Sequence, residues 1–250
     1  MKKNIVLSVE NLHVQLGKRM INKNISINVK EGEIVGIIGP NGCGKTTFFN
    51  AISGFAPIDT GLISINGEEV NNFTPHQRAR KGLSRGFQNV GVFKEMTLEE
   101  NIIMAIEQAE QLPWYWMFSR QEKKRVEKRV DTILDDVDLL SHKQSLAGLL
   151  SGGQLRLLEM AKLHALGGSL VLIDEPTAGV SPVLRGELRN AIAQLAKKHG
   201  RTILIIEHDL KFLFDLVDRV VVLVDGKKYM EGKPKEVQND ARLREVYFGT

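Results

Sequence analysis

The chain has 250 residues and a formal net charge of +4, and 42% of its residues are hydrophobic while 26% are charged. These values are typical of a globular protein with a sizeable core, and the single cysteine, Cys43, excludes an intrachain disulfide. Because no apolar run approaches the length of a membrane span and no arginine-rich or RNA-binding aromatic pattern occurs, we expect a cytoplasmic protein that does not bind nucleic acid.

The N-terminal part of the chain shows short apolar segments separated by turn residues. These segments predict strands at residues 7–9, 13–16 and 25–29. A hairpin is predicted at residues 63–70, because Asn66-Gly67 suits a turn that needs positive φ. Residues 33–38 are almost continuously apolar, as a strand buried on both faces requires.

The rest of the chain is helical at first and then alternates between strands and helices. Thr97 and Glu100 form a capping-box pattern at the start of one helix, and a charged helix is expected from residue 120 to about residue 137. Further on, strands are predicted at residues 170–173, 202–206 and 220–224, and helices at residues 184–199 and 210–217. This alternation predicts an α/β fold with a mostly parallel sheet, into which the middle helical region is inserted.

A glycine-rich loop follows the buried strand at residues 33–38. It fits the phosphate-loop pattern G-x-x-x-x-G-K-[ST], and a helix is predicted from Lys45 to about Ile52. Such a loop turns backbone N–H groups and the positive end of the helix toward one anion. A glycine-rich turn could match this pattern by chance, but the flanking strand and helix favour phosphate binding. The expected ATP contacts are Gly39, Pro40, Asn41, Gly42, Cys43, Gly44, Lys45, Thr46 and Thr47.

Two carboxylates end the apolar strand predicted at residues 170–173. Asp174 can hold Mg²⁺ directly or through water, and Glu175 can polarise an attacking water molecule. By itself this pair is weak evidence, because strands often end in acidic residues. Together with the phosphate loop, it forms the expected second half of an ATPase site. In that site Lys45 is expected to reach the β- and γ-phosphates, and the Thr46 hydroxyl to bind Mg²⁺.

The segment from Leu150 to Gln154 reads Leu-Ser-Gly-Gly-Gln and lies just before the Asp174-Glu175 strand. It resembles the signature motif of the ATP-binding-cassette (ABC) ATPases. A helix N-terminus capped by Ser151 is the simpler interpretation, and both can hold. The resemblance implies that this helix N-terminus contacts the γ-phosphate bound to an opposite subunit, with two ATP molecules between two subunits. The residues concerned are Ser151, Gly152, Gly153 and Gln154.

The remaining elements of the ABC pattern occur in the family's order. Gln88 stands where the family has its Mg²⁺-sensing glutamine, and His208 stands where it has its switch histidine. The resemblance therefore implies that His208 donates a hydrogen bond to the γ-phosphate. The implied catalytic residues are Glu175, His208, Gln88 and Lys45, and the implied Mg²⁺ ligands are Thr46, Gln88 and Asp174.

The resemblance covers nearly the whole chain and implies a single ABC ATPase domain. Its catalytic core is expected in residues 1–92 and 166–250, with an antiparallel β subdomain at the N-terminus. The helical subdomain that carries the signature motif is expected at residues 93–165.

Three residues depart from the usual pattern of the family. Leu16 stands where an aromatic side chain often stacks on adenine, so we expect weaker base discrimination and acceptance of GTP. Ser181 replaces the aspartate usual before proline, which indicates either altered coupling between the two sites or neutral drift. Cys43 is either a small filler of the phosphate loop or a thiol whose alkylation inhibits the ATPase unless ATP is bound.

Several local sequences resemble the ATPases of branched-chain amino-acid and urea-type importers. They include Phe87-Gln88 with residues 93–97, Ala178-Gly179, and residues 236–249. Lipopolysaccharide-export ATPases share much of this pattern, and a soluble ABC ATPase of an assembly complex is the alternative from another class. The importer resemblance implies three partners: transmembrane permease subunits, a second ABC ATPase subunit and a periplasmic or extracellular substrate-binding protein. It also implies a peripheral location on the cytoplasmic face of the cell membrane.

Residues 114–118 read Trp-Tyr-Trp-Met-Phe. Five large apolar residues in succession cannot all face one core from a single helix. We expect most of them to be buried in a corner of the helical region, with at least one exposed. The alternative is contact with a membrane partner or with the lipid interface, where tryptophan and tyrosine are favoured.

Overall fold

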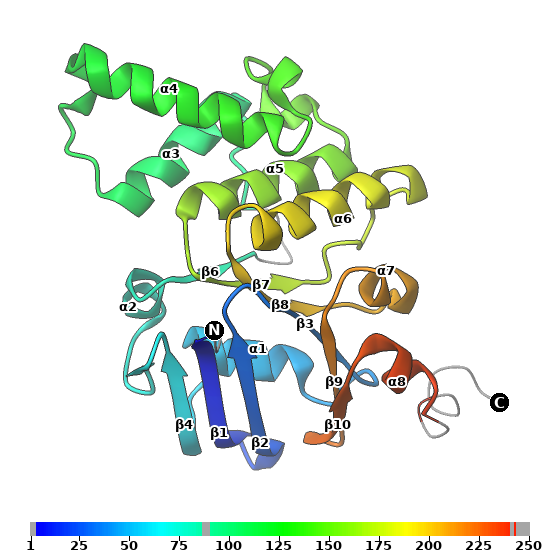
Figure 1. Cartoon of the computed structure of the whole chain (residues 1–250). Helices are drawn as coiled ribbons and strands as arrows, with labels where there is room; N and C mark the ends of the chain where they lie inside the picture. Colours follow the sequence, from blue (N-terminus) through cyan, green and yellow to red (C-terminus); the bar gives the residue numbers. More distant parts are fainter. Residues whose placement is uncertain (1–3, 87–90, 241–242, 244–250) are drawn as a thin grey trace. The chain divides into compact units, whose positions relative to one another are not determined.

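The computed structural model describes residues 4–86, 91–240 and 243 (Figure 1). The chain divides into two compact units. The first unit comprises residues 1–85, 169–175 and 200–250, and the second comprises residues 86–168 and 176–199. The first unit holds both β-sheets, and the second holds the longest helices.

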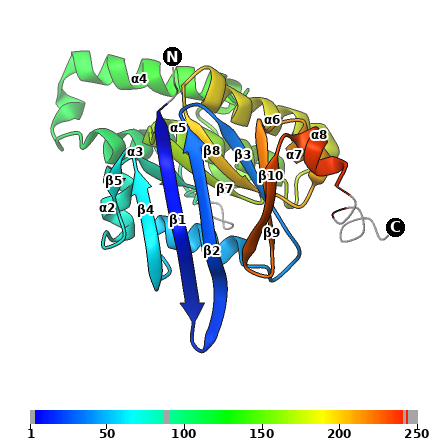
Figure 2. The same ribbon diagram turned by 60° about the horizontal axis from the view of Figure 1, so that its bottom comes forward.

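A four-stranded antiparallel sheet with the order β2-β1-β4-β5 opens the first unit (Figure 2). Its strands are β1 (Ile5–Leu16), β2 (Arg19–Lys30), β4 (Thr60–Ile65) and β5 (Glu68–Glu69). The three short strands predicted before residue 30 are therefore two long ones, because bulges near Asn11 and Asn24 let each strand continue through polar residues. The predicted hairpin turn is confirmed, with φ of 51° at Asn66 and 80° at Gly67.

A six-stranded sheet with the order β10-β9-β3-β8-β7-β6 forms the rest of the first unit's β-structure. Its strands are β3 (Ile34–Ile38), β6 (Leu83–Arg85), β7 (Leu170–Asp174), β8 (Thr202–Ile206), β9 (Arg219–Val224) and β10 (Lys227–Gly232). All are parallel except β10. Every residue of β3, β7 and β8 is buried, which explains the apolar runs that predicted them. The edge strands β6 and β10 were not predicted, because neither has such a run.

Among the described residues of the first unit, four α-helices have defined bounds. They are α1 (Lys45–Ser53), α2 (Pro75–Arg80), α7 (Leu210–Phe214) and α8 (Pro234–Gln238). Helix α1 ends at Ser53, one residue beyond the predicted end, and its C-cap Gly54 closes it in a left-handed conformation with φ of 81°. Phe48, Phe49 and Ile52 of α1 are fully buried in a cluster that includes apolar residues from both sheets. This packing fixes α1, and with it the loop that precedes it.

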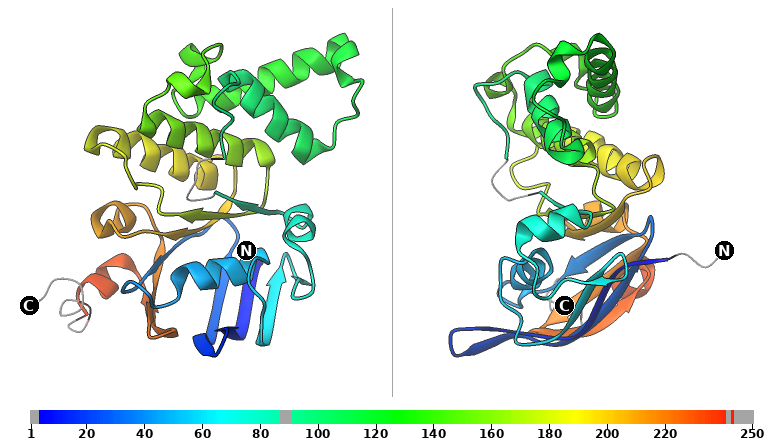
Figure 3. Two further views of the ribbon diagram at one scale, coloured as in Figure 1. Left: turned by 180° about the vertical axis from the view of Figure 1, so that it is seen from behind. Right: turned by 90° about the vertical axis from the view of Figure 1, so that its left-hand side faces the viewer.

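The second unit is helical (Figure 3). Its α-helices are α3 (Leu98–Glu110), α4 (Arg120–Asp135), α5 (Gly152–Leu166) and α6 (Pro182–Lys197), and short 3₁₀ helices η1, η2 and η3 lie at Trp116–Phe118, Leu140–His142 and Ala147–Leu149. The predicted capping box at Thr97 is confirmed. Over the described residues, no helix combines the length and the apolarity that crossing a membrane requires.

The prediction that most of residues 114–118 are buried is wrong. Only Trp116 is buried, at 6% exposure, and its Nε1 donates a hydrogen bond of 2.7 Å to Glu107 Oε1. Trp114 and Phe118 are 78% and 80% exposed, and Tyr115 and Met117 are also exposed. The three-residue helix η1 turns the Trp116 ring inward and leaves the side chains of Met117 and Phe118 exposed. The second unit therefore presents an aromatic patch, made of Trp114, Tyr115, Met117 and Phe118.

Candidate functional site

The candidate site lies at the carboxyl ends of four neighbouring parallel strands, β3, β8, β7 and β6. The glycine-rich loop follows β3, His208 comes two residues after β8, and Glu175 follows β7. Asp174 pairs in register with Ile206 of β8, which in turn pairs with Ile37 of β3. Because parallel strands end at the same edge of a sheet, segments far apart in the sequence meet there.

Two glycines give the phosphate loop its shape. A Cβ atom on Gly39 would lie 2.2 Å from the backbone oxygen of Leu223, so no larger residue fits. Gly44 has a φ of 101°, which side chains of L-residues rarely adopt, and it is the N-cap of α1. The Asn22 amide of β2 donates to the Gly44 carbonyl at 3.2 Å and so ties the loop to the antiparallel sheet.

The N-terminus of α1 is capped by a glycine, Gly44, and not by a polar side chain. Within the described residues, no side chain caps it, whereas Thr97 caps α3 and Ser151 caps α5. The first-turn N–H groups of α1 therefore lack the side-chain oxygen acceptor that α3 and α5 have, and a phosphate can supply one. Lys45 is buried beside them, and its ammonium donates to the carbonyls of Gly39 at 2.7 Å and Pro40 at 3.1 Å. Charge and geometry together favour an anion here.

Asp174 is a buried carboxylate at the end of β7. Burial raises its pKa, and the positive charge of Arg85 opposes that shift. Arg85 Nη2 lies 3.7 Å from Asp174 Oδ2 and its Nη1 donates to Asn50 and Ser53 of α1, at 2.8 and 2.6 Å. In the part of the chain that is described, Asp174 Oδ1 has no hydrogen-bond partner. A cation bound at Oδ1 would satisfy this oxygen and reverse the effect of burial.

Glu175 and His208 are in direct contact. His208 Nε2 and Glu175 Oε1 are 2.9 Å apart, and both side chains are partly exposed. Glu175 has a φ of 49°, an uncommon conformation for a residue other than glycine, and its backbone N–H donates to Ile206 at 2.9 Å. The chain thus turns sharply after β7 and directs this carboxylate toward His208. Strained backbone of this kind is concentrated at functional sites.

The signature segment, described with the second unit, begins helix α5. Ser151 is its N-cap and forms a capping box with Gln154, so the interpretation as a cap is confirmed. Gly153 is buried against α6, where an added Cβ would lie 2.3 Å from Leu184 Cδ1. Ser151 and Gly152 are exposed and accessible to another molecule. Ser181, the N-cap of α6, makes no side-chain capping bond.

Two predicted site residues stand apart from this cluster. Gln88 lies outside the described residues, and its role stays a prediction. Leu16 is an exposed apolar residue at the end of β1, and its contact with adenine also stays a prediction.

The sequence did not reveal Arg85 and Asn22 as site residues. Arg85 ties Asp174 to α1, and Asn22 holds the loop. Both lie on strands outside the recognised motifs, and neither has a local sequence pattern that marks it.

The structure bears on the predicted reactivity of Cys43. Its side chain is buried, and burial raises the pKa of its thiol while the charge of Lys45 opposes that shift. A smaller thiolate fraction at neutral pH and poor access both slow alkylation. We therefore expect iodoacetamide to modify the native chain at least about tenfold more slowly than a peptide thiol at pH 7.5, as followed by mass spectrometry. Rapid modification that Cys43→Ala abolishes and ATP prevents would restore the reactive-thiol hypothesis.

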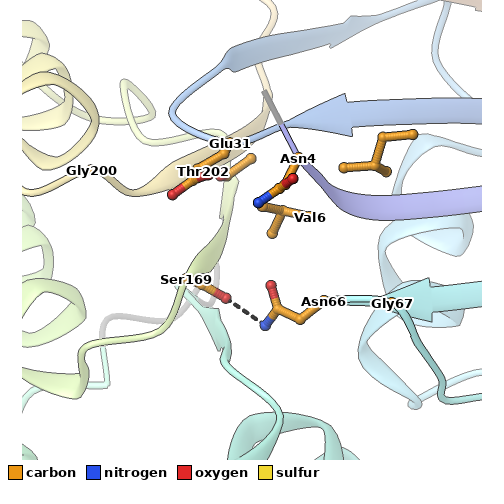
Figure 4. A pocket seen from close by; sticks show the side chains of 9 residues that line it. Asn4, Val6, Glu31, Asn66, Gly67, Ser169, Gly200 and Thr202 are labelled. Carbon is orange, nitrogen blue, oxygen red and sulfur yellow. Dashed lines mark hydrogen bonds between the residues drawn. The ribbon is translucent and has the colours of Figure 1, made fainter. Parts of the chain in front are cut away.

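A cavity lies at the opposite edge of the parallel strands, away from the candidate site (Figure 4). It has a volume of about 460 Å³, and its lining includes residues 4–6 at the start of β1, the Asn66-Gly67 turn, and Ser169 and Thr202, which precede β7 and begin β8. A hydrogen bond of 2.8 Å from the Asn66 amide to the Ser169 hydroxyl joins two of the residues that line it. Ligands of open α/β sheets bind at the carboxyl ends of the strands, so we assign no nucleotide to this cavity.

The chain is similar in sequence to a known protein family and to several of its characterised members. The family model described as ABC transporter matches residues 22–178. The high-affinity branched-chain amino acid transport ATP-binding protein BraF of Pseudomonas aeruginosa is 35% identical over 252 residues, which cover 98% of each chain. Its counterpart LivG of Escherichia coli is 34% identical with the same coverage. The lipopolysaccharide export system ATP-binding protein LptB of Haemophilus influenzae is 31% identical, over 98% of this chain and 97% of that protein.

Solved structures of similar fold are also ATP-binding cassettes of ABC transporters. The ADP conformation of an ATP-binding cassette of an ABC transporter matches with a TM-score of 0.85 and 32% identity, over 99% of this chain and 100% of that chain. A nucleotide-free cassette matches with a TM-score of 0.83 and 31% identity, over 99% and 100% of the two chains. The predicted α/β fold class is therefore confirmed.

Proposed function

Because the chain belongs to the ABC transporter family, we propose that it is the ATP-hydrolysing subunit of an importer of the branched-chain amino-acid type. The relatives named for branched-chain amino acid transport match it over nearly their whole length. The relative named for lipopolysaccharide export is less similar and gives the second candidate.

The ATPase function is supported mainly by one observation. Helix α1, which has no side-chain cap, begins at the same edge of the sheet at which Glu175 and His208 are in contact. Lys45 and the first-turn N–H groups of α1 bind the phosphates. Glu175 orients the attacking water and accepts its proton. His208 leaves Glu175 to donate a hydrogen bond to the γ-phosphate, where it stabilises the charge that develops during transfer.

The residues present fit a Mg²⁺ ion, which when bound neutralises phosphate charge. Asp174 supplies a buried oxygen that has no other hydrogen-bond partner among the described residues. Thr46 places an exposed hydroxyl on the first turn of α1. Carboxylate and hydroxyl oxygens are the hard ligands that Mg²⁺ prefers. Gln88 completes the proposed set.

We further propose that two subunits form the working enzyme. The exposed N-terminus of α5, with Ser151 and Gly152, contacts the γ-phosphate held by the phosphate loop of the other subunit. Closure around two ATP molecules drives the membrane partner to switch access, and hydrolysis reopens the dimer. In this proposal, residues 1–92 and 166–250 form the catalytic core, and residues 93–165 form the helical subdomain that carries the signature motif. The second subunit is either an identical chain or a related ATPase.

The exposed aromatic patch is consistent with binding to a membrane partner. Exposed apolar clusters of this kind mark interaction surfaces, and aromatic rings dominate their energetics. We expect Trp114→Ala with Phe118→Ala to leave ATPase activity of the isolated chain unchanged and to abolish transport in reconstituted vesicles. Trp116→Ala is the matched comparison, because its buried ring and hydrogen bond predict lower stability and loss of both activities. Loss of soluble ATPase activity in the double variant would show that the patch is needed for folding instead.

Co-purification tests the proposed function. The chain should be isolated from membranes with permease subunits, in a peripheral position on the cytoplasmic face, and an extracytoplasmic substrate-binding protein should stimulate its ATPase activity. Soluble partners alone would favour an assembly ATPase. Stimulation by lipopolysaccharide and not by an amino-acid-loaded binding protein would favour the export system.

The adenine contact predicted at Leu16 gives a test of nucleotide choice. A leucine side chain packs on a purine ring but supplies no aromatic stacking. We expect GTP to compete for the site with a Kd within about tenfold of that of ATP, which corresponds to less than about 1.4 kcal/mol of discrimination. Leu16→Tyr should increase the preference for ATP. A competition assay in which ATP is strongly preferred by the unaltered chain would contradict this expectation.

A further inference from the structure

Three helices of the second unit end at one point, and each end carries a metal-ligating side chain. Asp136 is the C-cap of α4, His164 lies in the last turn of α5, and His199 follows the C-cap of α6. One ligand atom from each residue lies within 4.8 Å of the other two. No part of the ATPase mechanism uses these residues, which lie in a different unit from the phosphate loop.

The distances within the cluster are close to those of a first coordination shell. His199 Nε2 lies 2.8 Å from Asp136 Oδ2, and His164 Nδ1 lies 3.6 Å from the same oxygen. Ligand atoms on a tetrahedral Zn²⁺ ion, at bond lengths of about 2.0–2.2 Å, stand roughly 3.4 Å apart. Small side-chain rotations therefore suffice to bring the three atoms around one ion.

The surroundings of the cluster suit a cation. The side chains of Asp136, His164 and His199 are only 7%, 13% and 18% exposed. Each lies at a helix C-terminus, where the unpaired carbonyl groups carry partial negative charge.

A cavity of about 350 Å³ adjoins both histidines. It is also lined by three cationic side chains, Arg125, Lys128 and Arg129. Glu110 pairs with both arginines, and Glu122 pairs with Arg125 at 2.9 Å, so much of this positive charge is offset. The cavity leaves room on one side of the cluster for a water molecule or an anionic ligand.

We propose that Asp136, His164 and His199 form a binding site for a divalent transition-metal ion of the Zn²⁺ class, with a further coordination position that opens into this cavity. Two imidazoles and one carboxylate are the donor set that such ions favour over Mg²⁺ or Ca²⁺. The bound ion would join the ends of α4, α5 and α6, and α5 is the helix that begins with the signature motif.

A simpler interpretation is that Asp136 only forms ion pairs and hydrogen bonds with its neighbours and binds no metal. Lys198 distinguishes the two interpretations, because its ammonium donates to Asp136 Oδ1. The two interpretations predict opposite results for this residue. Loss of Lys198 would weaken a cluster held together by ion pairs alone, but it would free the Asp136 carboxylate to bind a metal ion.

The test is a titration of the chelator-treated, nucleotide-free chain with Zn²⁺ against a chromophoric chelator, repeated with saturating MgADP to block the nucleotide site. We expect one site per chain that MgADP does not affect. His164→Ala, His199→Ala and Asp136→Asn should each weaken it at least about tenfold, whereas Lys198→Ala should preserve or strengthen it. His142→Ala, in the same unit but outside the cluster, is the control and should bind as the unaltered chain does.

Thermal unfolding provides a second measurement on the same proteins. Zn²⁺ should raise the Tm of the unaltered chain and of His142→Ala, and leave the Tm of His164→Ala unchanged. Circular dichroism confirms that each variant is folded before titration. Equal Zn²⁺ affinity in the unaltered chain and in folded His164→Ala or His199→Ala would overturn the proposal, as would weaker binding in Lys198→Ala.

Discussion

ATP hydrolysis should fall by about 10²- to 10⁴-fold when Glu175 is replaced by glutamine, while ATP binding is retained. Glutamine keeps the size and backbone preference of the residue, so the left-handed turn after β7 is not disturbed. It removes the carboxylate that accepts a proton from the attacking water. The phosphate loop and Lys45 are unchanged, so the nucleotide still binds. We therefore expect a closed, ATP-bound dimer to accumulate, which size-exclusion chromatography with ATP and Mg²⁺ would detect.

Glu69→Gln is the control for this substitution. It changes the same chemical group on the same unit, at an exposed residue of β5 away from the site. Its steady-state ATPase rate and dimer fraction should match those of the unaltered chain. Turnover at the normal rate by Glu175→Gln would contradict the role assigned to this carboxylate.

Replacing Arg78 by glutamine should lower the free energy of unfolding of the chain by about 3 kcal/mol or more. Arg78 is 1% exposed, and burial lowers the pKa of its guanidinium to about 10. Its Nη1 donates to the carbonyls of Ala51 and Ile52 at 2.6 and 2.8 Å, which belong to the last turn of α1. Without it, both carbonyls lose the hydrogen bond from the guanidinium, and the helix C-terminus loses a compensating positive charge.

Urea denaturation followed by circular dichroism measures this effect, and Arg80→Gln provides the matched control. Arg80 lies on the same helix α2 but is exposed, so we expect a change within about 0.5 kcal/mol. Arg78→Lys should recover only part of the stability, because one ammonium cannot replace a guanidinium that also donates to Asn71 and Phe73. Equal denaturation midpoints for Arg78→Gln and Arg80→Gln would contradict the assignment.

Much of the fold was predictable because its signals are local. The buried strands β3, β7 and β8 consist of apolar residues that have no polar face to expose, and the Asn66-Gly67 turn needs positive φ in any context. The Thr97 and Ser151 caps depend on side chains only three residues from their partners. The motif residues at Gly39–Thr47, Asp174 and His208 also follow recognisable strands.

Other features depend on contacts between residues far apart in the chain, which no local pattern encodes. The edge strand β6 has only three residues, and its terminal Arg85 acquires a role only because β6 pairs with β7 next to Asp174. The exposure of Trp114 and Phe118 was mispredicted, because composition describes how apolar a segment is and not which side of it a short helix turns inward.

The sequence alone determined the family, the order of the nucleotide-binding motifs and the strands that carry them, because each depends on neighbouring residues. Only the tertiary structure decided that Cys43 is buried, that His208 pairs with Glu175, and that the ends of α4, α5 and α6 meet. Desolvation and side-chain contact are properties of the packed chain. They arise only when strands and helices distant in sequence bury the same atoms.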